Sequence, residues 1–168
     1  FVMPDGTVKI GDFGFARVAE EEAEDAVLTP RGTLPYMACE QFREPSVRIT
    51  AAVLAAVDVC AFGRVLNEAA TGVVPWAGFA PEGLRHVVSR GRPPRDRIDN
   101  TPECEAIVPA ELRDGLRELV ERCCAPVWEQ RPTAEQVVKE LDFMVAMLPP
   151  VPPQDVDSSA AAEGTSGP

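Results

Sequence analysis

The chain has 168 residues, of which 45% are hydrophobic and 26% are charged, so it is long enough for one domain with a core and too short for two ordinary domains. Its formal net charge of −11 disfavours nucleic acid and anionic membranes as partners, because both require a basic surface. The sequence contains no apolar run near the ~20 residues that cross a bilayer, so no membrane partner is expected.

The first elements of the chain are a hairpin, a loop and a long helix. Residues 1–11 predict a short β-hairpin whose turn is Pro4-Asp5-Gly6. Residues 15–35 are polar and carry an acidic cluster, which is typical of a surface loop. Residues 49–71 are apolar on nearly every face and end at Gly72, which predicts a helix buried on all sides at the centre of the domain.

The second half predicts further helices. One runs from Pro81 to Arg90, and the stretch from 91 to 102 has no periodicity and predicts a loop. Proline in a first turn predicts another helix from Pro109, and Thr133 with Gln136 forms a capping box that starts the last one. The predicted apolar stripes of these two helices are Leu112, Leu116, Leu119, Val120 and Cys123, and Val137, Val138, Leu141, Met144 and Val145.

Five cysteines stand at irregular positions, at 39, 60, 104, 123 and 124. A disulfide framework and a zinc site are both unexpected, since there is no Cys-x-x-Cys pair and only one histidine. Reduced thiols indicate a cytoplasmic protein. The neighbours Cys123 and Cys124 predict one core thiol and one half-exposed thiol in preference to a redox centre.

Two strings carry the strongest functional signal. Asp12-Phe13-Gly14 is followed, one loop-length later, by Gly32-Thr33-Leu34-Pro35-Tyr36-Met37-Ala38-Cys39-Glu40. The tripeptide alone is more often an ordinary turn. Together the strings resemble the two ends of the activation segment of a protein kinase, in its serine/threonine form.

The resemblance implies roles for the residues of both strings. Asp12 would hold the Mg²⁺ that bridges the phosphates of ATP, Phe13 would pack differently in active and inactive states, and Gly14 would let the backbone swing. Thr33 would hydrogen-bond the catalytic machinery. The usual Ala-Pro-Glu is here Ala38-Cys39-Glu40, so a proline that stiffens the turn is replaced.

Two further matches lie downstream. Arg131-Pro132-Thr133 resembles the family's arginine before the final helix, which implies a buried structural ion pair between Glu40 and Arg131 across 91 positions. The alternative is two unrelated surface charges. Asp58-Val59-Cys60-Ala61-Phe62-Gly63 resembles the family's Asp-Val-Trp-Ser-Phe-Gly, in which the aspartate accepts N–H groups of the catalytic loop. With Thr71-Gly72-x-x-Pro75-Trp76, this string favours the tyrosine-kinase-like branch of serine/threonine kinases.

Thr29 stands four residues before Thr33, where an activating phosphate is commonly added in the family that the strings resemble. Pro30 behind it suits a proline-directed kinase. The arginine that usually receives the phosphate is not in this chain, so an ordinary loop threonine is an equal alternative.

The resemblance implies a mainly α fold, a kinase-like C-terminal lobe with a short N-terminal β-hairpin and no small lobe. Residues 1–148 would be a partial kinase domain and residues 149–168, rich in Pro, Ser and Ala, a disordered tail. No catalytic residue is present, because the Gly-rich loop, the phosphate-binding lysine and the catalytic loop are missing.

Two functions remain open at this point. In the first, the chain is part of a kinase that uses ATP and Mg²⁺ to phosphorylate serine or threonine of protein substrates, and the chain alone is inactive and binds neither cofactor tightly. In the second, it is a truncated pseudokinase that serves as an interaction module. In either case a protein partner would cover apolar surface that this lobe leaves exposed.

Overall fold

The computed structural model describes residues 1–16, 26–43, 45–94, 98 and 102–149. Within these residues the chain is mostly helical and forms no strand, which confirms the predicted mainly α class. The helices are α1 (Ala51–Thr71), α2 (Pro81–Ser89), α3 (Pro102–Ile107), α4 (Ala110–Cys123) and α5 (Ala134–Ala146). Short 3-10 helices are η1 (Phe13–Phe15), η3 (Leu34–Tyr36), η4 (Cys39–Phe42) and η5 (Trp128–Gln130).

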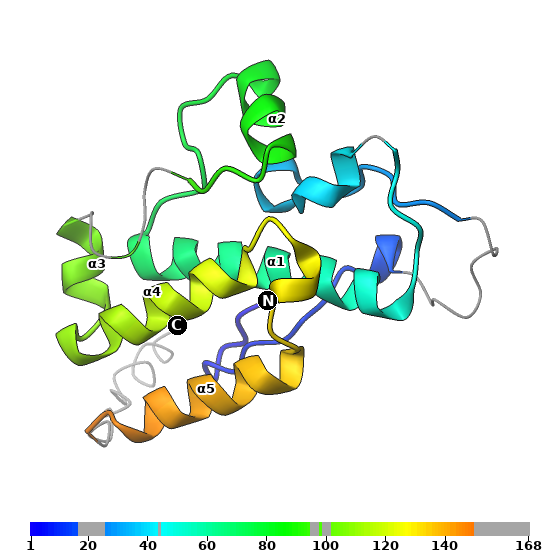
Figure 1. The fold of residues 1–168 in the computed structure, drawn as a ribbon. Coiled ribbons are helices and arrows are strands. Elements are labelled where there is room, and N and C mark those ends of the chain that lie inside the picture. Colours follow the sequence, from blue (N-terminus) through cyan, green and yellow to red (C-terminus); the bar gives the residue numbers. More distant parts are fainter. Residues whose placement is uncertain (17–25, 44, 95–97, 99–101, 150–168) are drawn as a thin grey trace, which may run out of the picture.

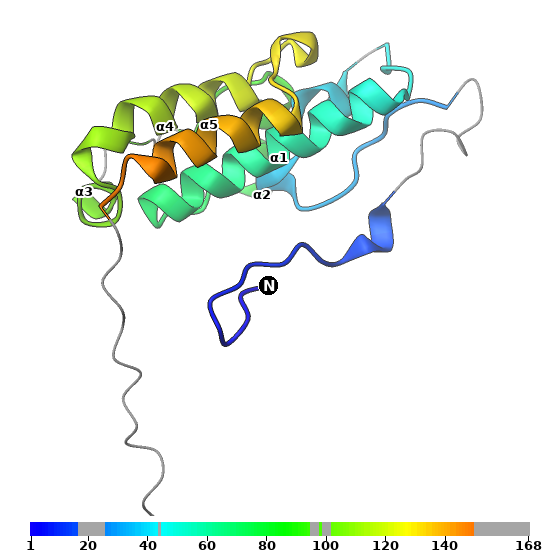
Figure 2. The same ribbon diagram turned by 90° about the horizontal axis from the view of Figure 1, so that it is seen from below.

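The N-terminal hairpin forms only in part. Its turn is present, with Gly6 at φ 81° and the Thr7 amide donating to the Asp5 carboxylate at 2.9 Å. Instead of two strands, the arms share a single antiparallel bridge between Val2 and Val8. All of residues 1–10 are exposed, and Figure 2 shows this segment standing apart from the helices. A two-stranded ribbon without a packed face does not extend its pairing.

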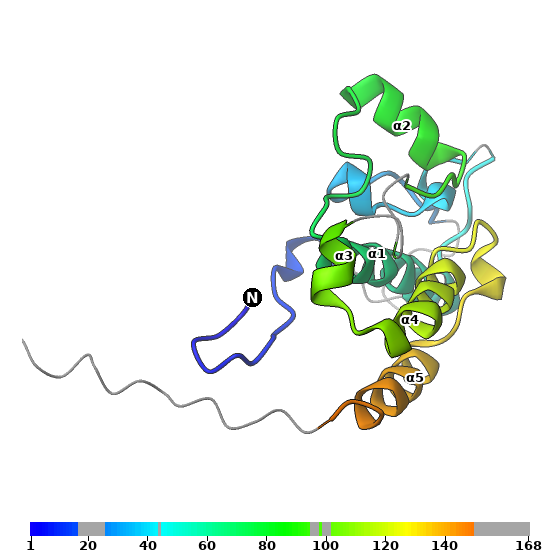
Figure 3. The same cartoon turned by 90° about the vertical axis from the view of Figure 1, so that its left-hand side faces the viewer.

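Helix α1 is the centre of the helical layer, as its sequence predicts. The Thr50 hydroxyl accepts the Val53 amide at the first turn, and Gly72 ends the helix with φ 70°. Its neighbours are α3, α4, η3 and η5. Figures 1 and 3 show it lying between α2 with the 3-10 helices and α4 with α5.

Helix α1 is not buried on every side, and that part of the prediction is wrong. Every third or fourth residue along it is exposed, which marks one continuous face of the helix. No element in the described part of the chain covers this face, although most of its side chains are apolar. We call it the open stripe, and it consists of Ala51, Ala55, Asp58, Phe62, Val65 and Ala69.

Helices α4 and α5 pack with α1 in one cluster of the core. Leu119 and Cys123 of α4 are fully buried against Val59 of α1 and Val137 of α5. The predicted α5 stripe is wrong at two positions, since Val138 is 55% exposed and Val145 is 64% exposed. Helix α5 lies at the outside of the layer, so only a narrow face of it is covered (Figure 2).

A second cluster joins α2 to the segment before α1. Met37 packs with Trp76, Leu84 and Val88, the last two from α2, which begins at the predicted Pro81. Helix α3 was not predicted. It has six residues and a single buried one, Cys104, so it shows no periodicity that sequence alone could detect.

Two predictions fall outside the described residues: the acidic cluster between Glu20 and Asp25, and the tail beyond Pro149. Among the helices that the structure describes, none has the length and apolarity to span a membrane.

Candidate functional site

Within the tripeptide Asp12-Phe13-Gly14, Asp12 immediately precedes η1, and Phe13 and Gly14 are the first two residues of η1. Asp12 adopts the left-handed conformation, with φ 64° and ψ 65°, and its side chain caps no backbone group. This conformation is uncommon for a residue with a side chain, though aspartate tolerates it better than most. Asp12 and Phe13 are exposed, Phe13 by 69%, so both side chains are available to groups outside the described chain.

Asp12 alone does not make a metal site. In the part of the chain that the structure covers, no three Asp, Glu, His or Cys side chains gather closely enough to hold an ion. Mg²⁺ is usually held in proteins by one or two carboxylates together with substrate phosphates and water. Asp12 therefore fits the part of one such ligand, and the phosphates would supply others.

The second string, together with Gln41 and Phe42, forms a compact segment from Gly32 to Phe42 that we call the ledge. Gly32, at φ 109°, starts it, Thr33 is exposed, and η3 and η4 follow in quick succession. Gln41 ties its two ends together, because the Gln41 side chain accepts the Ala38 amide at 2.9 Å and donates to the Arg31 carbonyl at 3.1 Å. The segment is thus held together in part by hydrogen bonds among its own and adjacent residues.

The buried ion pair between Glu40 and Arg131 is present. Arg131 donates from Nη1 to Glu40 Oε1 at 2.6 Å and from Nη2 to Oε2 at 2.8 Å, and the two side chains are 1% and 0% exposed. The same guanidinium donates to the carbonyls of Ala56 at 2.8 Å and Ala125 at 2.9 Å. One side chain therefore joins η4, helix α1 and the turn after α4.

The protonation of Glu40 follows from this pairing. Burial by itself raises the pKa of the Glu40 carboxyl, but the hydrogen bonds and positive charge of Arg131 outweigh burial and hold the pKa below its ordinary value. Two parallel N–H···O bonds between planar groups are the strongest geometry for such a pair. Glu40 is therefore ionised at neutral pH.

Cys39, which replaces the expected proline, does not disturb the turn. Its side chain is 3% exposed, and its sulfur lies 3.5 Å from the Pro126 carbonyl, which also accepts Arg43 Nη2 at 2.5 Å. Burial, followed by the negative charge of Glu40, raises the pKa of the Cys39 thiol. Cys39 is therefore a neutral packing residue in this turn.

Two contacts from α1 to η3 were not predicted from the sequence. Arg64 is 3% exposed, donates to the carbonyl of Met37 and lies 4.8 Å from the ring centroid of Trp76. Glu68 accepts a hydrogen bond of 2.5 Å from the hydroxyl of Tyr36. Arg64 and Glu68 stand four residues apart on one side of an otherwise apolar helix, and this spacing is the signal that indicates buried partners here.

Asp58 lies on the open stripe. Within the described residues it forms no hydrogen bond or ion pair, and desolvation raises the pKa of its carboxyl. An acid in such apolar surroundings is costly unless donors satisfy it. Asp58 is therefore available to donors from another segment.

Thr29 is exposed and follows the buried Leu28. The Leu28 amide donates to Val47 O at 2.7 Å and the Ile49 amide to Ala26 O at 2.9 Å, so Val27 and Arg48 form an antiparallel bridge. The backbone beside Thr29 is thus anchored next to the start of α1, while its hydroxyl remains accessible.

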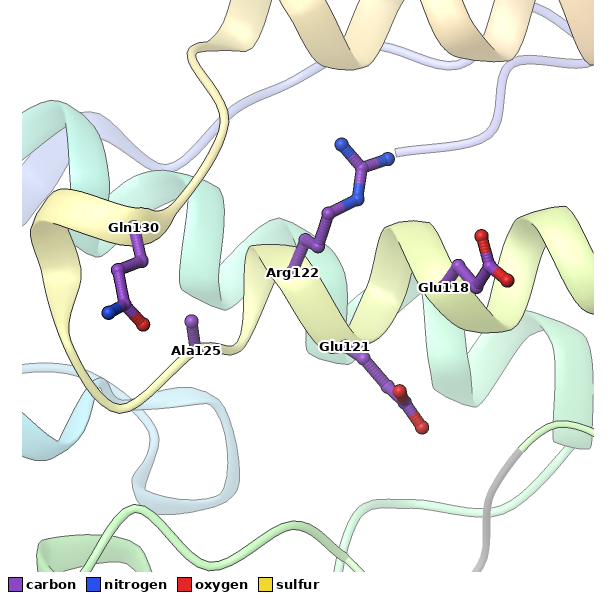
Figure 4. Close-up of a pocket in the computed structure, with 5 residues that line it drawn as sticks. All are labelled: Glu118, Glu121, Arg122, Ala125 and Gln130. Atoms are coloured by element: carbon purple, nitrogen blue, oxygen red, sulfur yellow. The ribbon is translucent and has the colours of Figure 1, made fainter.

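A surface hollow at the end of α4 is not a second candidate. Its lining residues are Glu118, Glu121, Arg122, Ala125 and Gln130. Figure 4 shows Glu121 and Arg122 pointing to opposite sides of α4, so the polar groups do not converge on one ligand. Arg122 instead pairs with Glu140 of α5, with one N–H···O distance of 3.0 Å.

Comparison with known proteins decides the family. The profile of the protein kinase domain matches residues 1–143, which is most of the chain. The chain belongs to the protein kinase family.

Individual kinases agree with this assignment. The chain is 32% identical over 140 residues to serine/threonine-protein kinase WNK of Caenorhabditis elegans, a match that covers 82% of this chain and 6% of that protein. It is 29% identical over 168 residues to the LRR receptor-like serine/threonine-protein kinase FEI 2 of Arabidopsis thaliana, covering 95% and 26%. It is 28% identical over 146 residues to serine/threonine-protein kinase VIK of Arabidopsis thaliana, covering 84% and 29%. The chain thus spans less than a third of each of these kinases.

Replacement of Glu40 by alanine tests the buried ion pair. We expect Glu40→Ala to lower the free energy of unfolding by about 3–5 kcal/mol in urea titrations, because Arg131 would remain buried and unpaired. The matched control is Glu140→Ala, which breaks the exposed pair with Arg122 and should cost about 1 kcal/mol or less. Equal losses for the two variants would contradict the role of burial. Since the folded pKa of Glu40 is lowered, its contribution is complete above the ordinary glutamate pKa and is lost as pH falls through the folded pKa.

Tyr36 is the only tyrosine of the chain, so its titration can be followed directly by ultraviolet absorbance. Burial, followed by the hydrogen bond and negative charge of Glu68, raises the pKa of Tyr36 to about 12. We expect tyrosinate to form near that pH in the folded chain, and at lower pH in Glu68→Gln, with Glu82→Gln as a surface control. The stabilisation from Tyr36 is complete below the unfolded tyrosine pKa of about 10 and is lost as pH rises through 12. A midpoint near 10 in the folded chain would show that the contact is absent.

Proposed function

We propose that the chain forms the activation segment and C-terminal lobe of a serine/threonine kinase domain that transfers the γ-phosphate of ATP to protein hydroxyls. The supporting observation is the Glu40–Arg131 pair, because it joins the end of the segment that begins at Asp12 to the start of α5. The relatives that share this stretch are named serine/threonine kinases. Protein substrates follow from the family.

Within this proposal Asp12 is the Mg²⁺ ligand, and Phe13 and Gly14 form the hinge of the activation segment that follows Asp12. ATP with Mg²⁺ is the cofactor of the complete domain, where the metal neutralises the phosphate charge. The exposure of Asp12 and its free carboxylate support this role. Thr33, also exposed, faces the catalytic machinery.

Asp58 and the open stripe are the proposed docking face for the rest of the domain. Asp58 would accept N–H groups of the catalytic loop, which explains an acid placed among Phe62, Val65 and small apolar residues. The string from Asp58 to Gly63, with Thr71-Gly72 and Pro75-Trp76, supports the tyrosine-kinase-like branch. A tree built from the complete catalytic domain tests that placement.

We propose that this polypeptide alone does not transfer phosphate. Phosphoryl transfer needs a Gly-rich loop, a phosphate-binding lysine and a catalytic-loop aspartate, and these 168 residues include none of them. The two lysines cannot substitute, since Lys9 is in the hairpin and Lys139 pairs with Glu135 on α5. We assign residues 1–148 to the partial domain and 149–168 to a tail, and place the protein in the cytoplasm because its five cysteines are free.

The alternative function is a pseudokinase that binds a partner through the open stripe. The exposed apolar side chains Phe62 and Val65, at 40% and 52%, are the observation that favours it. In both functions another protein segment covers the open stripe. The two functions differ only in whether the assembled protein transfers phosphate.

A kinase assay on the longest polypeptide encoded in this reading frame, beside the 168-residue chain, tests the proposal. With Mg²⁺ and ATP labelled at the γ-phosphate, we expect the longer polypeptide to label serine and threonine of a generic protein substrate, and the 168-residue chain to give none. Asp12→Asn should lower the rate of the longer polypeptide by about 10²-fold or more, because it loses the metal. The control is Asp5→Asn, an exposed carboxylate in the same hairpin.

Activity of the longer polypeptide that is unaffected by Asp12→Asn would overturn the role of Asp12. A longer polypeptide that is folded, contains the upstream elements and is inactive would favour the pseudokinase. Binding of a protein partner that is lost in Phe62→Asp would then identify the open stripe as the interface.

We also propose Thr29 as a phosphorylation site, with Arg48 as the group that receives the phosphate. Val27 and Arg48 are directly opposite in their bridge, and Thr29 is two residues from Val27 on the same face. Diagonal positions of such a pairing are roughly 7–8 Å apart, a gap that a phosphate and an arginine side chain can span. Both side chains are exposed, so the phosphate on Thr29 and the guanidinium of Arg48 can approach each other.

Phosphorylation of Thr29 by a proline-directed kinase should raise the Tm of the chain by a few degrees, because the new ion pair anchors the segment to the start of α1. The increase should disappear in Arg48→Ala and persist in Arg90→Ala, which removes an exposed arginine at the end of α2. An increase that survives Arg48→Ala would show that another group receives the phosphate.

A further inference from the structure

Three of the five cysteines gather where α1 crosses the end of α4. Cys60 lies on α1, Cys123 is the last residue of α4, and Cys124 follows it. The Cys124 sulfur lies 3.8 Å from the carbonyl oxygen of Cys60, and each of the two thiols shifts the pKa of the other. The sequence spacing of 64 residues gave no indication of this contact.

The backbones of the two helices approach closely at this point. A Cβ atom placed on Gly63, one turn after Cys60, would lie 2.6 Å from Cys123 Cβ and 3.0 Å from Cys124 Sγ. No side chain fits between the helices there, so glycine permits the approach. A disulfide requires its two Cα atoms within about 7 Å, and this crossing brings α1 and the end of α4 together at short range.

The two thiols differ in burial and environment. Cys60 is 1% exposed and Cys124 is half-buried. The interaction with the Cys124 thiol is the largest effect on Cys60 and lowers its pKa. Burial opposes this shift, and the positive charges of Arg64 and Arg131 add to it. Holding the shared proton raises the pKa of Cys124. Cys124 is therefore the sulfur that solvent reaches, and Cys60 is the sulfur with the greater thiolate character.

We propose that Cys60 and Cys124 are an oxidation site at which a peroxide forms a disulfide between α1 and the end of α4. The proposal depends on the contact between α1 and the end of α4, and not on the adjacency of Cys123 and Cys124 in the sequence. The family string that this chain resembles has tryptophan at position 60, so the pair is a feature of this chain.

The chemistry uses two thiols and one peroxide. The proton of Cys124 passes to the Cys60 thiolate, and the Cys124 sulfur, which external peroxide reaches first, attacks a peroxide oxygen; the O–O bond breaks, a sulfenic acid forms, and the departing hydroxide takes a proton from solvent and leaves as water. The sulfur of Cys60 then attacks the Cys124 sulfur and displaces hydroxide, which takes the Cys60 proton and leaves as a second water. Two thiols are oxidised, and one hydrogen peroxide is reduced to two waters.

The bond would reinforce a junction that already depends on Arg131. Arg131 donates to Ala56 O, one turn before Cys60, and to Ala125 O, one residue after Cys124. A disulfide would fix the same two segments covalently and so hold the carbonyls that position the guanidinium. Oxidation therefore stiffens the lobe at the base of the Glu40–Arg131 pair.

Competing uses of the cluster have no support in the described residues. Adjacent Cys123 is 0% exposed, and burial raises its pKa to about 11, so solvent oxidants do not reach its sulfur. No group of three or more metal-ligating side chains occurs in the described part of the chain.

Peptide mapping after peroxide treatment tests the proposal on the 168-residue chain. Trypsin releases Cys60 in peptide 49–64 and Cys124 in peptide 123–139, since the bond before Pro132 resists cleavage. After dilute hydrogen peroxide and thiol blocking, we expect a linked pair of these peptides, two hydrogens lighter than their sum, that dithiothreitol separates. The oxidised chain should also gain roughly 5–10 °C in Tm, reversibly.

Variants assign the sulfur. Cys124→Ser should abolish the linked peptides, while Cys123→Ser, the adjacent control in the same peptide, should retain them, as should Cys104→Ser on α3. The proposal is overturned if peroxide gives only a sulfinic acid at Cys124, if the link persists in Cys124→Ser, or if the links join two copies of the chain. The wild-type map alone shows whether peptide 49–64 is linked to peptide 123–139, and absence of that link overturns the proposal without any variant. The variants then assign the sulfur within peptide 123–139.

Discussion

The guanidinium of Arg131 is the interaction on which the rest of the lobe depends. It neutralises Glu40 and satisfies two backbone carbonyls, one in α1 and one after α4, and both charged side chains are buried. A buried arginine without these partners would be strongly unfavourable, and so would a buried glutamate. The pair therefore stabilises the fold only when η4, α1 and the turn before η5 are all in place, which couples three segments distant in sequence.

The proposed activation segment depends on the same arrangement. Glu40 fixes η4, and Arg64 and Glu68 of α1 hold η3 through Met37 and Tyr36. The ledge from Gly32 to Phe42 is therefore attached to α1 directly through Arg64 and Glu68, and indirectly through Arg131, which also donates to Ala56 O. Upstream of it, Asp12 and Phe13 are exposed and little constrained, which suits residues whose partners belong to the nucleotide and to the remainder of a kinase domain. The proposed function requires this arrangement, in which the ledge is anchored to α1 and the side chains of Asp12 and Phe13 are exposed.

Much of this arrangement could be predicted from sequence. Local signals predicted the end of α1 and the starts of α2, α4 and α5, because Gly72, Pro81, Pro109 and Thr133 act through local hydrogen bonds and fixed dihedral angles. The Glu40–Arg131 pair could be predicted only through the family resemblance, since no local rule connects residues 91 positions apart. The exposed face of α1 could not be predicted. The apolar composition of the helix indicates that it is buried, but it does not indicate which of its faces other elements cover. Likewise the Cys60–Cys124 contact depends on a helix crossing that the sequence does not encode locally.

Hydrogen exchange of backbone amides in Arg131→Met is the most direct test that one side chain couples three segments. The methionine fills much of the same volume without the charge and donors. The account predicts that protection falls together in residues 38–43, in the first turns of α1 and in residues 124–131, relative to wild type. Loss of protection confined to residues 124–131, with η4 and α1 unchanged, would contradict it.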